Sequence, residues 1–225
     1  MRRTKEASWE TRNQILDAAE HVFLERGVAA TTLAQVASSA HVSRGAIYWH
    51  FENKSDLFSS MVERIMLPTE SFVASIERVC ESDPLGRMRA VLIASLRDAA
   101  CNPRTWRVLN VIFTKCELTD DSGAMLLRCR TAAVELRARL KVALHEAMLK
   151  GQLPSALDVE YASTLLQALW AGVLRESLLD SSVIELDRDA ERIVETWLDV
   201  LRHSHACLTA WHALRQDVAA HLSHA

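Results

Sequence analysis

Apolar residues recur at helical spacing near the start of the chain, between residues 15 and 23. Steps of three and four residues place side chains on one face of an α-helix, so this stretch predicts a first helix. Gly27 follows it where helices commonly end, because glycine readily adopts the left-handed conformation that closes the last turn. The residues that share this face are Ile15, Ala18, Ala19, Val22 and Phe23.

The next segment contains signals for two shorter helices joined by a turn. Thr32 and Gln35 stand three residues apart before apolar residues, which is the pattern of a capping box at the start of a second helix. After a brief turn, Ser43 can cap a third helix in which Ile47 faces inward. The pattern therefore predicts a helix-turn-helix.

The outer face of this third helix carries residues suited to phosphates and base edges. Arg44 offers a planar fork of donors, and Gly45 removes a side chain that would hold the backbone away from DNA. Lys54 and the amides at the next helix start could converge on one phosphate. The alternative is a helical hairpin with core aromatics. The residues expected to contact DNA are Thr32, Ser43, Arg44, Gly45, Tyr48, Trp49, His50 and Lys54.

From residue 55 onward the pattern stays helical, with few strand-favouring residues in alternation, so the predicted fold class is all-α. Gly151 is expected to end a long helix that begins near Asp120. The last two helices contain more apolar residues than one small core needs. The expected helix starts are Asp83-Pro84, Asn102-Pro103, Asp158, and either Asp187 or Asp189.

A resemblance to a known family is carried by long stretches of the chain. The DNA-binding segment of TetR-family repressors is similar to TTLAQVASSAHVSRGAIYWHFENKSDLF. Three further stretches resemble the AcrR-like branch of the family, which represses multidrug efflux pump operons. They are the opening RRTKEASWETRNQILDAAEHVFLERGVAATT, KCELTDD at 115–121 and GQLP at 151–154. The likeness ends near Leu208. His41 departs from it, because the family usually has Gly there and a positive backbone angle is costlier for His.

These observations divide the chain into three parts. We expect a helix-turn-helix DNA-binding domain at residues 1–54 and a larger helical ligand-binding and dimerisation domain at 55–208. A C-terminal extension of unknown role follows at 209–225. With 225 residues and 49% hydrophobic content, the chain has enough apolar material for a large core beyond the head.

Charge and hydropathy limit the possible partners. The net charge of −3 is unlike that of a protein that coats nucleic acid indiscriminately, so DNA affinity must be local. No apolar run reaches membrane-spanning length and the start lacks a signal sequence, which predicts a cytoplasmic protein. Basic residues near the start could form an arm that reaches a DNA groove, or a frayed tail. They are Arg2, Arg3, Lys5 and Arg12.

A homodimer is expected, because one short recognition helix touches few base pairs and two heads about one DNA turn apart would read a near-palindromic operator. In TetR-like proteins the last two helices pack against their copy as a four-helix interface, which would use the excess of apolar residues. The alternative is that both helices only cover the body's own core.

Apolar stripes in the body indicate a plain core on the sequence alone. The AcrR-like resemblance instead implies a cavity for small apolar or amphipathic inducers, with Asn110, Thr114 or Gln167 supplying hydrogen bonds. Binding would tilt the helix expected from Asn53 to about Met66 and release the operator. The implied ligand-binding residues are Ile65, Met88, Leu92, Leu96, Leu109, Asn110, Phe113, Leu136, Leu140, Leu166, Gln167 and Trp170.

The five cysteines show no paired spacing, so reduced thiols are expected. Cys116 beside Lys115 could sense oxidation, although its spacing from Ile112 favours burial. A joint metal site near the end of the chain would require an unwound segment, and solvated histidines are the favoured alternative. The residues concerned are His203, His205, Cys207 and His212. A metal- or thiol-redox-responsive regulator is therefore the alternative function.

Enzymatic motifs are missing from the sequence. There is no GxSxG elbow, glycine-rich phosphate loop or HExxH pair, so we expect neither an enzyme nor a bound cofactor or metal. A helical adaptor that binds only protein would leave Arg44, His50 and Lys54 without a purpose. The expected partners are an operator in double-stranded DNA, a small-molecule inducer and a second copy of the chain.

Overall fold

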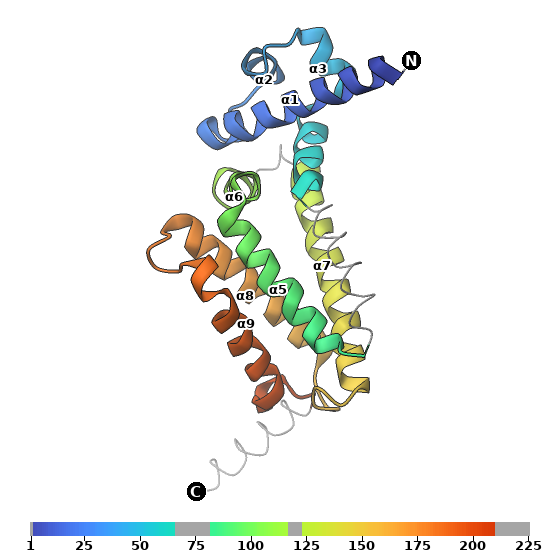
Figure 1. Ribbon diagram of the computed structural model, residues 1–225, viewed down its shortest axis with the longest axis vertical. Helices are drawn as coiled ribbons and strands as arrows, with labels where there is room; N and C mark the ends of the chain where they lie inside the picture. The colour runs from blue at the N-terminus through green and yellow to red at the C-terminus, as the bar shows by residue number, and fades with distance from the viewer. Residues whose placement is uncertain (1, 66–81, 117–122, 210–225) are drawn as a thin grey trace, which may run out of the picture. The chain divides into compact units, whose positions relative to one another are not determined.

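The structure is a computed structural model that describes residues 2–65, 82–116 and 123–209 (Figure 1). The expected all-α fold is confirmed, since the described residues contain only helices, loops and an isolated antiparallel bridge between Leu157 and Leu208. Residues 54–65 are helical. The other helices are α1 (Arg2–Arg26), α2 (Leu33–Ser39), α3 (Arg44–His50), α5 (Pro84–Cys101), α6 (Pro103–Asn110), the π-helix η1 (Val111–Lys115), α7 (Gly123–Leu149), α8 (Val159–Leu179), α9 (Leu186–His203) and the 3₁₀ helix η3 (His205–Cys207).

The chain forms two compact units. The first unit combines residues 1–71 with 98–132, and the second combines 72–97 with 133–225. The domain boundary expected between residues 54 and 55 stays a prediction, because packing alone does not show which part folds by itself.

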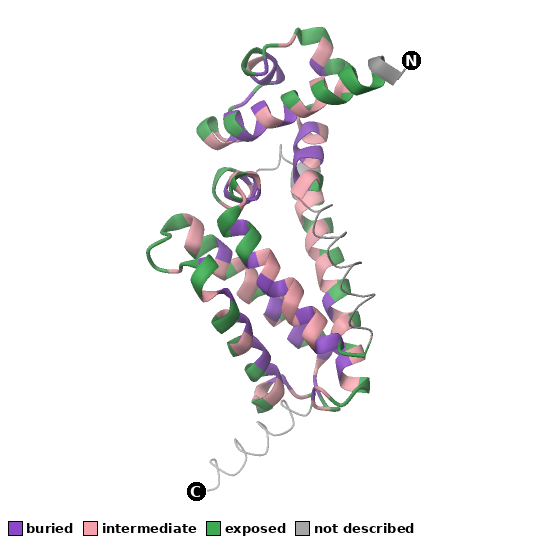
Figure 2. Cartoon of the chain, in the orientation of Figure 1, coloured by how far each residue is buried: buried purple, intermediate pink, exposed green. Residues whose placement is uncertain are grey.

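The core of the first unit lies where α1 packs against α2, α3, α6 and η1. The apolar face predicted for α1 is buried, from Ile15 to Phe23 (Figure 2). Phe23 lies close to Phe58, with ring centroids 6.5 Å apart, and Phe51 is buried at the end of α3. This core fixes the α2 and α3 pair against α1.

The predicted helix ends in the first unit are confirmed. Gly27 has a φ of 80° and donates its N–H to the Phe23 carbonyl at 2.9 Å, which closes α1. The Thr32 side chain accepts from the Gln35 N–H at 3.3 Å, and the Gln35 side chain accepts from the Thr32 N–H at 2.8 Å. This reciprocal capping box begins α2 without leaving those donors unpaired.

The second unit contains most of α5 and α7 together with α8 and α9. At the start of α5, Asp83 accepts a hydrogen bond from the Gly86 N–H at 2.8 Å, as the Asp-Pro pattern predicted. The Gln152 side chain donates to the same carboxylate at 2.7 Å. These two bonds, the Gly86 one first, lower the pKa of Asp83. Asp158 caps α8 by accepting from the Tyr161 N–H at 3.0 Å, which confirms that predicted start.

The predicted start of α9 is wrong by a few residues. The helix begins at Leu186 with Glu185 at the N-cap position, rather than at Asp187 or Asp189. Both aspartates lie in the first turn, where a carboxylate interacts favourably with the positive helix end without capping it. Asp189 also pairs with Arg188 at 2.8 Å.

The α8 and α9 helices contribute to a core on one side only. Leu166, Leu174, Val194 and Leu198 are buried. Other apolar residues predicted for these helices are half-buried, and they are Leu165, Leu169, Trp170, Val173 and Ile193. No helix in the described ranges is long and apolar enough to cross a membrane.

Candidate nucleic-acid interface

The turn between α2 and α3 is closed by one left-handed residue. His41 has a φ of 52°, so the positive angle expected at this position is confirmed. On either side of it, the Ala40 N–H donates to the Val36 carbonyl at 2.8 Å and the Val42 N–H donates to the Ala37 carbonyl at 3.0 Å. These bonds satisfy the last carbonyls of α2 and fix the direction in which α3 begins.

The α3 helix has one buried and one open face, as predicted. Ser43 caps it by accepting from the Ala46 N–H at 3.1 Å, and Ile47 is fully buried. Arg44 is exposed, and so are Tyr48 and Trp49, with 61% and 82% of their surfaces accessible. Because Tyr48 and Trp49 are exposed and do not pack in a core, the alternative of a hairpin with core aromatics is wrong.

Gly45 has no structural reason to lack a side chain. A Cβ atom built there would meet only the Ser43 Oγ, at an ordinary contact distance of 3.8 Å, and its φ is not positive. Neither packing nor backbone strain within the protein therefore selects glycine. This fits the predicted role, in which the small residue lets an external surface approach α3 closely.

Lys54 is used differently from its predicted role. Its ammonium group donates to the carbonyl oxygens of Val28, Ala29 and Thr31 at 2.7, 2.9 and 2.9 Å. These three bonds occupy all three donors of an ammonium group. In this structure Lys54 therefore holds the turn before α2, and its predicted phosphate contact stays a prediction.

The basic start of the chain is helical, because α1 begins at Arg2, and its predicted contact with a DNA groove stays a prediction. Arg12 is part of the folded unit: its guanidinium lies 5.0 Å from the centroid of the Phe51 ring and donates to the Ser60 hydroxyl at 2.9 Å. Burial, followed by the positive charge of Arg12, lowers the pKa of His50. His50 is thus favoured in its neutral form beside the exposed face of α3.

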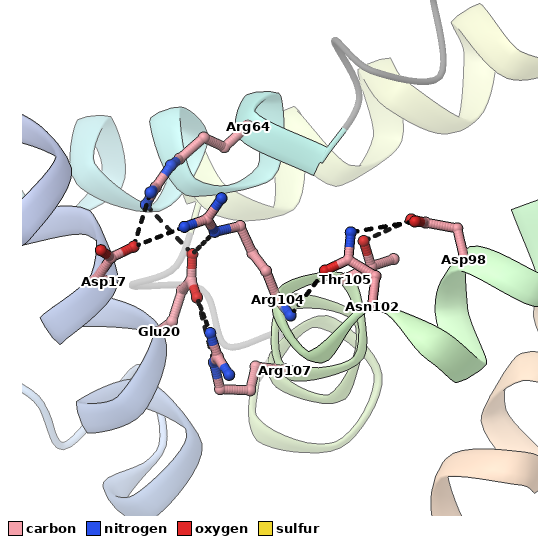
Figure 3. Close-up of polar contacts among 8 residues, drawn as sticks. All are labelled: Asp17, Glu20, Arg64, Asp98, Asn102, Arg104, Thr105 and Arg107. Carbon is pink, nitrogen blue, oxygen red and sulfur yellow. Dashed lines mark hydrogen bonds and ion pairs between the residues drawn. The ribbon is translucent and has the colours of Figure 1, made fainter. Parts of the chain in front are cut away.

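A buried carboxylate connects α1 with α6 (Figure 3). Glu20 of α1 is fully inaccessible to solvent, and it accepts two hydrogen bonds from Arg107 of α6, at 3.2 and 3.0 Å. Arg104, also of α6, lies 3.3 Å from Glu20, and Arg64 lies 3.4 Å from it. Asp17 accepts from both of these arginines, at 3.2 and 2.7 Å. Two carboxylates and three guanidinium groups therefore join three helices within the first unit.

The sequence did not predict this cluster. One signal was available, because Glu20 interrupts the apolar face of α1 between Ala19 and Phe23. A charge on a core-facing stripe is rarely buried unless it is paired. Which arginines pair with it could not be read from the sequence, since they come from helices far apart along the chain.

Two family models match the chain. One, described as bacterial regulatory proteins of the tetR family, matches residues 15–61, and the other, described as the C-terminal region of MAATS-type transcriptional repressors, matches residues 83–203. The chain belongs to the tetR family of bacterial regulatory proteins. The AcrR-like resemblance is confirmed as well, and the expectation of a DNA-binding regulator rather than an enzyme is confirmed with it.

Similar proteins cover almost the whole of this TetR-family regulator. The transcriptional regulator TtgR of Pseudomonas putida is 40% identical over 92% of this chain and 98% of its own. The crystal structure of NalD, the secondary repressor of the MexAB-OprM multidrug efflux pump in Pseudomonas aeruginosa, has a TM-score of 0.77 and 30% identity over 88% of this chain and 99% of its own. A SmeT–triclosan complex has a TM-score of 0.78 and 29% identity over 87% and 93%.

The residues implied as a ligand site in this TetR-family regulator are mostly packed in the cores. Those buried are Met88, Leu92, Leu96, Leu109, Asn110, Leu140 and Leu166. Those half-buried are Ile65, Phe113, Leu136, Gln167 and Trp170. None of them lines either of two surface hollows found in the second unit, one between α8 and α9 and one beside Asp83. The cavity implied by the resemblance stays a prediction.

The polar side chains among the implied ligand-binding residues already form hydrogen bonds within the chain. Asn110 accepts from the Thr114 hydroxyl at 2.5 Å. Gln167 accepts from Arg137 and donates to the Ala133 carbonyl, both at 2.9 Å. The Trp170 indole donates to the Ser95 hydroxyl at 3.0 Å. A ligand that bonded to these groups would have to replace those contacts.

Among the described residues, His203, His205 and Cys207 do not gather into a metal site, and His212 of the predicted group lies outside the described residues. Across the described ranges, no three His, Cys, Asp or Glu residues lie close enough together to hold a metal ion. The chain leaves the helix at Ser204 and forms η3, where Cys207 is buried while His203 and His205 are exposed.

Proposed function

We propose that this TetR-family regulator is a cytoplasmic homodimer that represses a multidrug efflux operon and leaves its operator when a small apolar or amphipathic compound binds. The observation that carries the proposal is the open face of α3. Arg44, Tyr48 and Trp49 are exposed there on a helix that is fixed from behind by Ile47. The similarity to NalD, a repressor of a multidrug efflux pump, supports the class of operon.

A dimer through α8 and α9 would cover apolar surface that each chain leaves accessible. Leu169, Val173 and Ile193 are half-buried, and 37% of Val200 is accessible. Gly172 of α8 is exposed, and a Cβ atom built on it would meet nothing within 4 Å. Small residues of this kind allow two helices to approach closely. These features support the interface that the family resemblance implies.

A substitution at Gly172 tests that interface. Gly172→Arg adds a long side chain to open surface, so the single chain should fold normally while the dimer is blocked. Val142→Arg, on an exposed position of α7, is the matched control and should remain dimeric. Sedimentation velocity measures the difference. Dimers of equal stability in both variants would contradict an α8 and α9 interface.

If a bound ligand is to release the operator, a movement in the ligand-binding domain must be transmitted to the DNA-binding face of α3. In the first unit the bonds between α6 and Glu20 supply a direct connection to α1. A ligand that shifts α6 would pull on α1 through these bonds and change the spacing of the two heads. A coupling free energy of about 2 kcal/mol would suffice for a useful response.

Triclosan is a suitable first probe, because a structurally similar protein, SmeT, forms a complex with it. Fluorescence anisotropy of DNA from upstream of the regulator's own gene would report binding, and triclosan should release that DNA. Arg107→Lys should bind the same DNA but respond less to triclosan. Specific binding that neither triclosan nor a panel of efflux substrates reverses would contradict ligand release.

A further inference from the structure

The thiol groups of Cys116 and Cys129 form a hydrogen bond in the first unit. Cys116 is the C-cap residue of η1, and Cys129 lies in α7. Both side chains are half-buried and pack against the apolar core that contains Phe23 and Phe58. The fold thus brings two nucleophilic side chains into contact from separate helical segments.

The other described cysteines lie in different environments. Cys101 is exposed, and Cys207 is buried in the second unit. Burial raises the pKa of the Cys207 thiol, which favours the unreactive protonated form. These two residues provide controls for chemistry that depends on the contact between Cys116 and Cys129.

The hydrogen bond gives the two thiols different roles. Donation from Cys116 lowers the pKa of Cys129 to about 7, with a further contribution from the positive charge of Arg128, while burial opposes the shift. The same bond, followed by burial, raises the pKa of Cys116. Because a thiolate is the nucleophilic form of cysteine, Cys129 is the residue that attacks an oxidant, and Cys116 then attacks the oxidised sulfur of Cys129.

We propose that Cys116 and Cys129 are an oxidation site, at which hydrogen peroxide or an organic peroxide converts the two thiols into a reversible disulfide. With hydrogen peroxide, the Cys129 thiolate attacks one oxygen, so that an S–O bond forms, the O–O bond breaks and the released hydroxide takes up a proton to become water. The Cys116 sulfur then attacks the sulfenic sulfur, an S–S bond forms, and the hydroxyl group leaves with the Cys116 proton as a second water. Two thiols lose two electrons, and the peroxide gains them.

Closing this bond would displace the end of η1. A disulfide has an S–S distance of about 2.05 Å, which is shorter than any hydrogen-bonded sulfur contact, so Cys116 must move toward α7. The carbonyl of its neighbour Lys115 accepts from the Val28 N–H at 3.1 Å, and the Val28 carbonyl accepts from Lys54. Oxidation would therefore disturb the turn before α2. We expect weaker operator binding, a consequence that rests on the proposed function.

The disulfide is tested without any DNA. The full-length protein is treated with increasing hydrogen peroxide, its free thiols are blocked with iodoacetamide, and its peptides are mapped by mass spectrometry before and after reduction with dithiothreitol. Peptides containing Cys116 and Cys129 should become linked and should separate on reduction. The Cys101→Ser variant should behave like the natural protein, whereas Cys116→Ser and Cys129→Ser should form no such link.

Several outcomes would overturn the site. One is oxidation of Cys129 to a sulfinic acid with no linked peptide, and another is reaction of Cys101 before either residue of the pair. Thermal unfolding of each serine variant shows whether it is folded, and Cys116→Ala serves as a second substitution if Cys116→Ser is not.

Operator binding gives a separate readout. If the reduced protein and the linked form bind the operator equally well, the predicted effect of oxidation on the turn before α2 is wrong, although the disulfide itself is confirmed. If reduced protein binds no operator, the proposed function fails while the peptide map still decides the oxidation site.

Discussion

Glu20, a fully buried residue of α1, accepts hydrogen bonds from both the Nε and the Nη2 atoms of Arg107 in α6. Glu20→Ala removes the buried carboxylate that pairs with Arg107, Arg104 and Arg64. These guanidinium groups would then lose a hydrogen-bond acceptor at a site with little access to water. We predict that the free energy of unfolding falls by about 3–5 kcal/mol, as for other broken buried pairs. Chemical denaturation measures this change.

An exposed ion pair provides the control for Glu20. Glu191 pairs with Arg97 at 3.0 Å, and both side chains are about half accessible, at 56% and 45%. Glu191→Ala should therefore cost no more than about 1 kcal/mol. Equal losses for the two variants would mean that the Glu20 cluster contributes no more than a surface pair.

Lys54→Met should destabilise the first unit, because it removes three hydrogen bonds from the turn that precedes α2. We expect a loss of about 2 kcal/mol in unfolding free energy, since bonds from a charged donor are worth more than neutral ones. Denaturation without DNA measures it. If the stability is unchanged and the salt dependence of DNA binding falls by about one phosphate contact, Lys54 is instead a phosphate ligand.

His41→Gly should stabilise the turn between α2 and α3. A residue with a Cβ atom is disfavoured at a φ of 52°, whereas glycine adopts this angle freely. We predict a gain of up to about 1 kcal/mol in unfolding free energy, because relief of the left-handed conformation exceeds the entropy that glycine loses on folding. The matched change His21→Gly, at an exposed position within α1, should lower stability by about 1 kcal/mol. A loss at both positions would show that the His41 side chain makes a contribution larger than its backbone strain.

The reactivity of Cys129 should depend on pH in a range where an ordinary thiol is protonated. With its pKa lowered to about 7 from an ordinary value of 9.0, its alkylation by iodoacetamide should reach half its maximal rate near pH 7. Cys116→Ser weakens the bond that favours the thiolate, so the profile should move to higher pH. Cys101→Ser should leave it in place. A profile near pH 9 in the unsubstituted protein would contradict the contact between the thiols.

The head of the molecule could be predicted from the sequence in detail, because its signals are local. The helix caps, Gly27, the positive φ at His41 and the outward face of α3 all depend on residues a few positions apart. The start of α9 was misplaced for a related reason: several acidic residues stand near one helix end, and the spacing does not select among them.

Contacts between distant segments could not be predicted in this way. The partners of Glu20, the three carbonyl acceptors of Lys54 and the pairing of Cys116 with Cys129 depend on how separate helices pack. The sequence indicated Cys116 as a possible sensor but gave no reason to connect it with Cys129, which stands 13 positions further along the chain.

The central claim is that the open face of α3 reads an operator, and a titration of purified protein onto DNA from upstream of its own gene tests it most directly. Binding should be specific relative to an unrelated fragment and should weaken steeply between two salt concentrations. Arg44→Ala should cost about 1–3 kcal/mol of binding free energy, while Lys150→Ala, which removes a charge at the exposed end of α7, should cost little. Equal, weak binding of both fragments by all three proteins would contradict the claim.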